Sequence, residues 1–88
     1  MNFGQASNQT ASAVVNARPC ELIGFYVNST SSGTIVFHDA ASASINNALS
    51  GTITPAIGFH WFPATLGAGL RIVIGGTLNV TLFYKPRG

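Results

Sequence analysis

Two residues whose side chains could do acid–base chemistry stand side by side in this sequence, His38 and Asp39, in the stretch TIVFHDA (34–40). A histidine that acts as a general base needs an orienting partner across space, within hydrogen-bonding distance. The apolar residues before the pair predict a β-strand, in which neighbouring side chains point to opposite faces. Asp39 is predicted to start a turn by bonding the backbone two residues further on. The pair is therefore interpreted as a strand end, and an enzyme is not expected.

The other groups that could bind a metal or form a covalent bond are few. The chain contains one cysteine, Cys20, besides two histidines, one aspartate and one glutamate. An internal disulfide is impossible, and the spacing of a zinc site is not present. Cys20 has no nearby cation that would activate its thiol, so we expect a buried, inert side chain. No phosphate-binding loop is found either, and no cofactor is expected.

The most aromatic stretch of the chain is GFHWFP (58–63). Alternation along a strand would place Phe59 and Trp61 on one face and His60 and Phe62 on the other. Aromatic side chains are enriched at the centres of protein interfaces. We predict an oligomer interface in this region, made of His60, Trp61, Phe62 and Phe83. A sugar-stacking platform around Trp61 is the alternative.

The elements that carry these residues are predicted to be strands. Apolar and polar residues alternate with period two in four stretches, where β-branched and aromatic residues dominate. In the first stretch, Leu22, Gly24 and Tyr26 would face one side, and Ile23, Phe25 and Val27 the other. In the second stretch, Ile35 and Phe37 would lie opposite Val36 and His38. In each of the last two stretches one side would hold a single set: Leu70, Ile72 and Ile74 in the third, and Leu78, Val80, Leu82 and Tyr84 in the fourth. We count six to eight short strands, so the predicted fold is all-β, a small antiparallel β-sandwich of jelly-roll type.

Turns are expected where glycine, serine and asparagine gather, at 28–33, at 67–69 and at 75–76. Residues 39–51 are predicted to form a loop, because serine and asparagine disfavour a helix there. Residues 1–12 are small and polar, and they form an N-terminal arm. This arm would contact a neighbouring subunit or fold onto its own domain. Residues 13–88 would form a single domain.

Size and charge together point to an assembled protein. A chain of 9.1 kDa buries only about 63% of its surface on folding, so additional stabilisation is needed, and oligomerisation is the remaining means. Charged residues make up 7% of the sequence, against about 25% in soluble domains. The net charge of +2 is too dispersed for a nucleic-acid interface. No apolar run could span a membrane, and the first residues do not resemble a signal peptide.

Two stretches, LIGFYVNSTSSGTIVFHDA (22–40) and GLRIVIGGTLNVTLFYKP (69–86), resemble small virion proteins of tailed bacteriophages. They are most similar to the short decoration, or cement, proteins on capsids of phages of cyanobacteria and other aquatic bacteria. The resemblance implies a compact β-sandwich or jelly roll that assembles as a homotrimer and caps gaps between subunits of the major capsid protein. It implies no catalytic residues. Tail and fibre proteins carry related segments, so a tail-fibre or glycan-binding component is the alternative.

This resemblance places the protein on the exterior of a virion, after synthesis in the host cytoplasm. The N-terminal arm and the C-terminal residues YKPRG (84–88) are then the natural tethers to the capsid. A basic tail beside an acidic shell would guide binding, while neutral and apolar contacts would supply most of the attraction. The predicted capsid contacts are Phe3, Gln5, Arg18, Lys85 and Arg87.

Overall fold

A computed structural model describes residues 4–86 and shows an all-β protein, as the sequence predicts. Its five strands are β1 (Gln5–Gln9), β2 (Ala13–Asn16), β3 (Cys20–Asp39), β4 (Gly58–Leu66) and β5 (Leu70–Pro86). All strand pairs are antiparallel and belong to one sheet with the order β1-β5-β3-β4, while β2 also pairs with β5. The all-β, antiparallel prediction is confirmed, whereas the jelly-roll connectivity is not.

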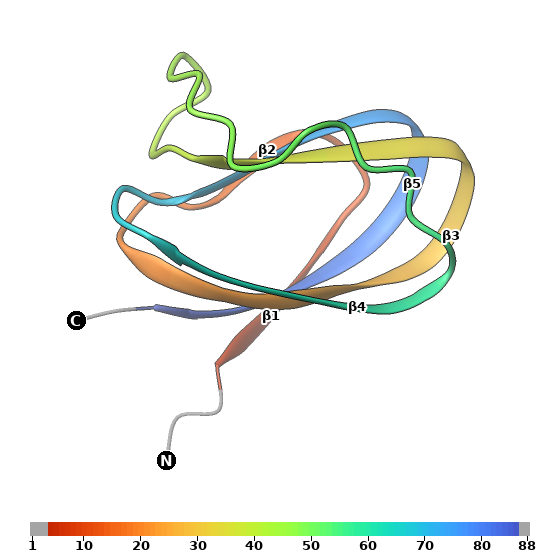
Figure 1. Ribbon diagram of the computed structural model, residues 1–88, viewed down its shortest axis with the longest axis horizontal. Coiled ribbons are helices and arrows are strands. Elements are labelled where there is room, and N and C mark those ends of the chain that lie inside the picture. The colour runs from red at the N-terminus through yellow and green to blue at the C-terminus, as the bar shows by residue number, and fades with distance from the viewer. Residues whose placement is uncertain (1–3, 87–88) are drawn as a thin grey trace.

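Two long strands bend this single sheet into two layers (Figure 1). β3 and β5 pair along almost their whole length, from Cys20 with Pro86 to Asp39 with Leu70. The first layer contains β1, β4, the first part of β3 and the last part of β5. The second layer contains β2 with the remaining parts of β3 and β5, and the bridges formed by Ala48 and Ile53 extend it.

The predicted count of six to eight short strands is wrong, because two of the predicted turns lie inside the long strands. Residues 28–33 belong to β3 and residues 75–76 to β5. They are the bend between the layers, where Ser32 and Gly76 have φ angles of 56° and 67°. A Cβ atom at Gly33 would lie 2.5 Å from the Thr77 carbonyl oxygen, so the two strands approach too closely there for a side chain. The turn at 67–69 and the helix-free loop after Asp39 are confirmed.

The core lies between the two layers and consists of inward side chains of β3, β4 and β5. In β5 the residues predicted to share one side, Leu70, Ile72, Leu78, Val80, Leu82 and Tyr84, are buried, and Ile74 packs against the core. In the first part of β3, the predicted assignment of side chains to the two faces of the strand is wrong. Leu22, Phe25 and Val27 are all buried, because a β-bulge between Leu22 and Gly24 shifts the alternation by one residue.

Within the predicted N-terminal arm, residues 5–9 pair with the domain of the same chain. β1 pairs with β5, with Gln5 opposite Tyr84 and Gln9 opposite Val80. The contact to a neighbouring subunit, which the sequence left open, is not needed to position residues 5–9. Of the predicted capsid contacts, Phe3 and Arg87 lie outside the residues that the structure describes.

Candidate interaction surface

His38 lies at the end of β3, in a site that is closed to solvent. Its side chain is only 5% exposed, and its Nδ1 has no hydrogen-bond partner. Arg71 is its cross-strand neighbour on β5, and Ala48 bridges it from the loop on the other side. Desolvation lowers the pKa of His38, and the positive charge of Arg71 lowers it further. The imidazole is therefore held in its neutral form.

The Asp39 carboxylate bonds to the turn between β4 and β5. It accepts backbone N–H bonds from Gly67, Ala68 and Gly69 at 3.1, 2.8 and 3.2 Å. The prediction that it bonds the backbone two residues further on is wrong, because this turn lies beside the strand end. Burial raises the pKa of Asp39, but the three hydrogen bonds outweigh it and hold the pKa below its usual value. The carboxylate is thus kept in its charged form while it fixes a turn.

Cys20 is completely buried at the start of β3, as the sequence predicts. Burial is the main cause that raises the pKa of its thiol; the Asn16 side chain lowers it, and Asp39 raises it. This places the thiol far from the conditions that activate a nucleophile. Within residues 4–86, no group of three or more His, Cys, Asp or Glu side chains could hold a metal ion.

An exposed cluster of aromatic rings covers the outer side of the first layer. Its members are Tyr26 from β3, Phe59 and Trp61 from β4, and Phe83 from β5, and we name this surface the aromatic face. The indole of Trp61 is 69% exposed, and Phe59 and Tyr26 are 50% and 42% exposed. The Phe59 ring lies 6.4 Å from Trp61 and 6.0 Å from Phe83 between centroids. Rings this exposed and this close form a contiguous apolar patch, which is the kind of surface that proteins use for binding.

The four residues predicted for the oligomer interface are divided between the two sides of the first layer. Trp61 and Phe83 belong to the aromatic face. His60 and Phe62 point the other way: the His60 ring stacks on Phe25 at 5.0 Å, and Phe62 meets Phe37 edge-on at 5.0 Å. His60 Nε2 also bonds the Ala56 carbonyl oxygen at 2.7 Å. These two side chains support the aromatic face from behind.

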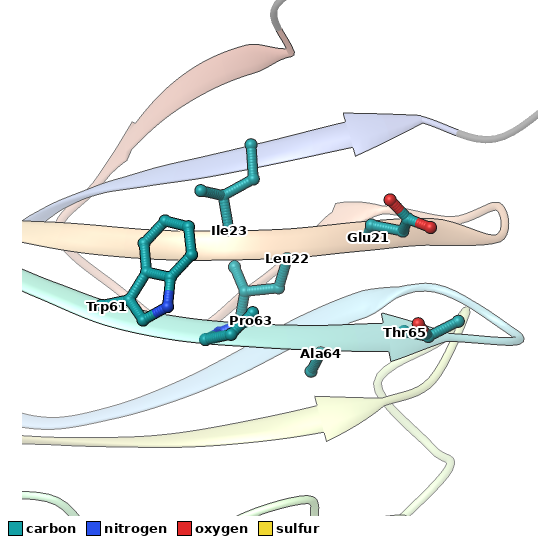
Figure 2. A pocket seen from close by; sticks show the side chains of 7 residues that line it. All are labelled: Glu21, Leu22, Ile23, Trp61, Pro63, Ala64 and Thr65. Carbon is teal, nitrogen blue, oxygen red and sulfur yellow. The ribbon is translucent and has the colours of Figure 1, made fainter.

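A shallow groove of about 380 Å³ runs between Trp61 and the start of β3 (Figure 2). The indole and the Ile23 side chain stand on the same outer side of the layer. Glu21 and Thr65, which pair across β3 and β4, provide the polar end of the groove. Glu21 also pairs in register with Lys85 of β5. The complete lining is Glu21, Leu22, Ile23, Trp61, Pro63, Ala64 and Thr65.

A cluster of side-chain amides adjoins the aromatic face, and sequence reasoning did not find it. Asn8 Nδ2 donates to Asn79 Oδ1 at 2.7 Å and to Thr81 Oγ1 at 3.1 Å. Asn28 Nδ2 donates to the same two oxygens, at 3.2 and 2.9 Å. These residues come from β1, β3 and β5, so only the strand register could have revealed the cluster. It makes this end of the layer polar but uncharged.

The predicted capsid contacts that the structure describes are dispersed. Gln5 lies on β1, where its Oε1 accepts a hydrogen bond from the Tyr84 hydroxyl at 3.2 Å. Lys85 is exposed near the end of β5, and Arg18 is exposed in the link between β2 and β3. Lys85 lies at one end of the aromatic face, two residues after Phe83 on β5.

In the part of the chain that the structure describes, no helix is long and apolar enough to cross a membrane. Comparison of the chain with protein-family models, with curated proteins and with solved structures gives no match.

Proposed function

We propose that this protein is a structural virion protein, which decorates or cements the exterior of a tailed-bacteriophage capsid as an oligomer. The aromatic face is the observation that carries the proposal. Three strongly exposed rings sit on a chain with only four cationic and two acidic residues. Such a surface is suited to lie against protein rather than water. The resemblance to decoration proteins supports the capsid as the partner and a homotrimer as the oligomer.

The chemistry of the surface supports assembly, between copies and on the shell, by apolar and neutral polar contacts. A buried aromatic side chain removes about 150–250 Å² from water, and each Å² of apolar area contributes about 25 cal/mol. The amide cluster beside the rings can form neutral hydrogen bonds without the desolvation cost of a charge. Because many copies would bind one shell, weak individual contacts would add up to stable decoration.

Co-sedimentation with purified capsid shells tests this proposal. The shells come from tailed phages of cyanobacteria and other aquatic bacteria and lack their own decoration protein. We expect saturable binding that persists in 1 M NaCl, because salt screens charges and leaves apolar contacts intact. Trp61→Ala should weaken binding, whereas Ile45→Ala, which removes an exposed apolar side chain from the loop after β3, should not. Release of the protein by moderate salt would contradict the proposed mode of attachment.

A glycan-binding module is the second candidate, and the groove beside Trp61 favours it. An exposed indole next to a carboxylate and a hydroxyl, from Glu21 and Thr65, combines a stacking surface with hydrogen-bonding groups for sugar hydroxyls. A glycan array separates the two candidates. Binding to a defined glycan that disappears in Trp61→Ala, while the oligomeric state stays unchanged, would favour the glycan-binding module.

A further inference from the structure

Two opposite charges lie side by side at one end of the aromatic face without forming an ion pair. Glu21 on β3 and Lys85 on β5 are register partners, and both side chains are exposed. No ion pair joins them to each other or to another residue within 4–86. They are two of only six charged residues in the chain. The two charges are therefore available to a partner that presents the same pair in reverse order.

A second copy of this chain presents that reversed pair. Consider a two-fold axis that lies in the aromatic face, parallel to the strands and between β3 and β5. This axis places β3 of one copy over β5 of the other. Glu21 of each copy then faces the partner's Lys85, so the interface contains two ion pairs. Such reciprocal contacts are the defining property of a two-fold interface.

The same axis also matches large side chains with small ones. Trp61 and Phe83 share a row across the layer with Gly24 and Ala6. The axis places the Trp61 indole over the partner's Ala6, which leaves room for the ring. Phe83 meets the partner's Gly24, which has no side chain of its own. The Phe59 ring of the same copy lies over that glycine, where a Cβ atom would be 2.9 Å from Phe59 Cζ. Aromatic rings thus contact each other at the centre, as in well-packed interfaces.

We propose that the aromatic face pairs with the aromatic face of a second copy about this two-fold axis, with Glu21 of each copy bound to the partner's Lys85. This inference rests on the proposed function and deepens it: the aromatic face joins the copies of the oligomer, and paired copies hold the shell through two sites at once, so Trp61→Ala weakens capsid binding by separating the pair. A homotrimer cannot form by this contact alone, since a two-fold contact joins copies in pairs. A three-fold contact elsewhere would give six copies.

Charge reversal in separate chains tests the pairing. Light scattering on the full-length protein should give twice the 9.1 kDa mass of one chain, or six times that mass. Glu21→Lys and Lys85→Glu should each weaken pairing at least about ten-fold, because like charges then face each other across the interface. An equimolar mixture of the two variants should restore pairing, because both lysines of the Glu21→Lys copy then face glutamates of the Lys85→Glu copy. An effect confined to one chain cannot produce this rescue.

Two further variants test the rings independently of the charges. Trp61→Ala should weaken pairing at least about ten-fold, and Ile45→Ala, a matched removal of an exposed apolar side chain, should leave it unchanged. Circular dichroism shows whether each variant is folded. A monomer at high concentration, a trimer of three copies, or a mixture that behaves like the separate charge variants would overturn the pairing. Binding to capsids by such a monomer or trimer would still support the proposed function.

Discussion

Asp39 and His38 are neighbours in the sequence, but their side chains serve different parts of the molecule. The Asp39 carboxylate accepts three backbone hydrogen bonds from the β4–β5 turn. His38 is buried beside Arg71 and under the loop residue Ala48. The sequence indicated the strand end at this pair, but the turn that Asp39 binds lies about 30 residues further along the chain. A contact of that length depends on tertiary structure and not on local propensity.

Replacing Asp39 should therefore loosen a turn far away in the sequence. Asp39→Ala leaves three N–H groups of the β4–β5 turn without their acceptor, and we expect a loss of about 1–3 kcal/mol in the free energy of unfolding. Asp39→Asn keeps one acceptor oxygen and should lose less. Asn46→Ala, in an exposed part of the loop after β3, should change stability by at most about 0.5 kcal/mol. Urea unfolding measures all three variants; equal stability of Asp39→Ala and wild type would show that the turn holds without the carboxylate.

Protonation of His38 and of Asp39 should each lower the stability of the fold in acid, in two separate pH ranges. The pKa of His38 is lowered in the folded state, so the unfolded chain takes up a proton first as the pH falls through 6.5, and stability is lost there. The pKa of Asp39 is also lowered, so a second loss begins as the pH falls through 3.8. Urea unfolding between pH 8 and pH 3 should show both steps. His38→Leu should remove the upper step and Asp39→Asn the lower one, and an upper step that persists in His38→Leu would have another cause.

At the scale of the elements, the alternation of β5 could be predicted and the length of the strands could not. Leu78, Val80 and Leu82 alternate without interruption, and all three are buried. In β3, a bulge places Phe25 inward against the simple alternation. Glycine and serine at 28–33 and 75–76 predict turns, because a bend within a strand needs the same positive φ angles as a turn. Whether strands continue through such a bend is decided by pairing with a distant strand.

The bend between the layers gives a prediction about two glycines. Gly76 has a φ of 67°, a backbone conformation that costs other residues about 1–2 kcal/mol, and a Cβ there would also collide with the Ser32 carbonyl. Gly76→Ala should therefore destabilise the fold by at least about 1 kcal/mol. Gly51→Ala is the matched control, because no atom lies within 4 Å of its Cβ position. It should be neutral or should stabilise by up to about 1 kcal/mol. Equal urea midpoints for the two variants would mean that the bend tolerates a side chain.

At the scale of the whole molecule, part of the aromatic face was accessible from the sequence. Alternation along β4 places Phe59 and Trp61 on the same side, and the structure shows both exposed. Phe83 joins them only because β5 and β4 both pair in register with β3. Tyr26 joins them through the same register and also through the bulge in β3. The unpaired Glu21 and Lys85 depend on the same register. Composition predicts that part of the surface is covered by protein, and the fold shows where the exposed rings gather.

The proposed pairing of aromatic faces gives a prediction about salt. Apolar contact between rings is not screened by salt, while two exposed ion pairs contribute only about 0.2–1 kcal/mol each. Raising NaCl from 0.05 to 1 M should therefore weaken association by no more than those two ion pairs contribute. Sodium sulfate at equal ionic strength should strengthen association, because sulfate favours burial of apolar surface. Analytical ultracentrifugation in both salts measures the dissociation constants. Complete dissociation in 1 M NaCl would show that charges, rather than the rings of the aromatic face, hold the copies together.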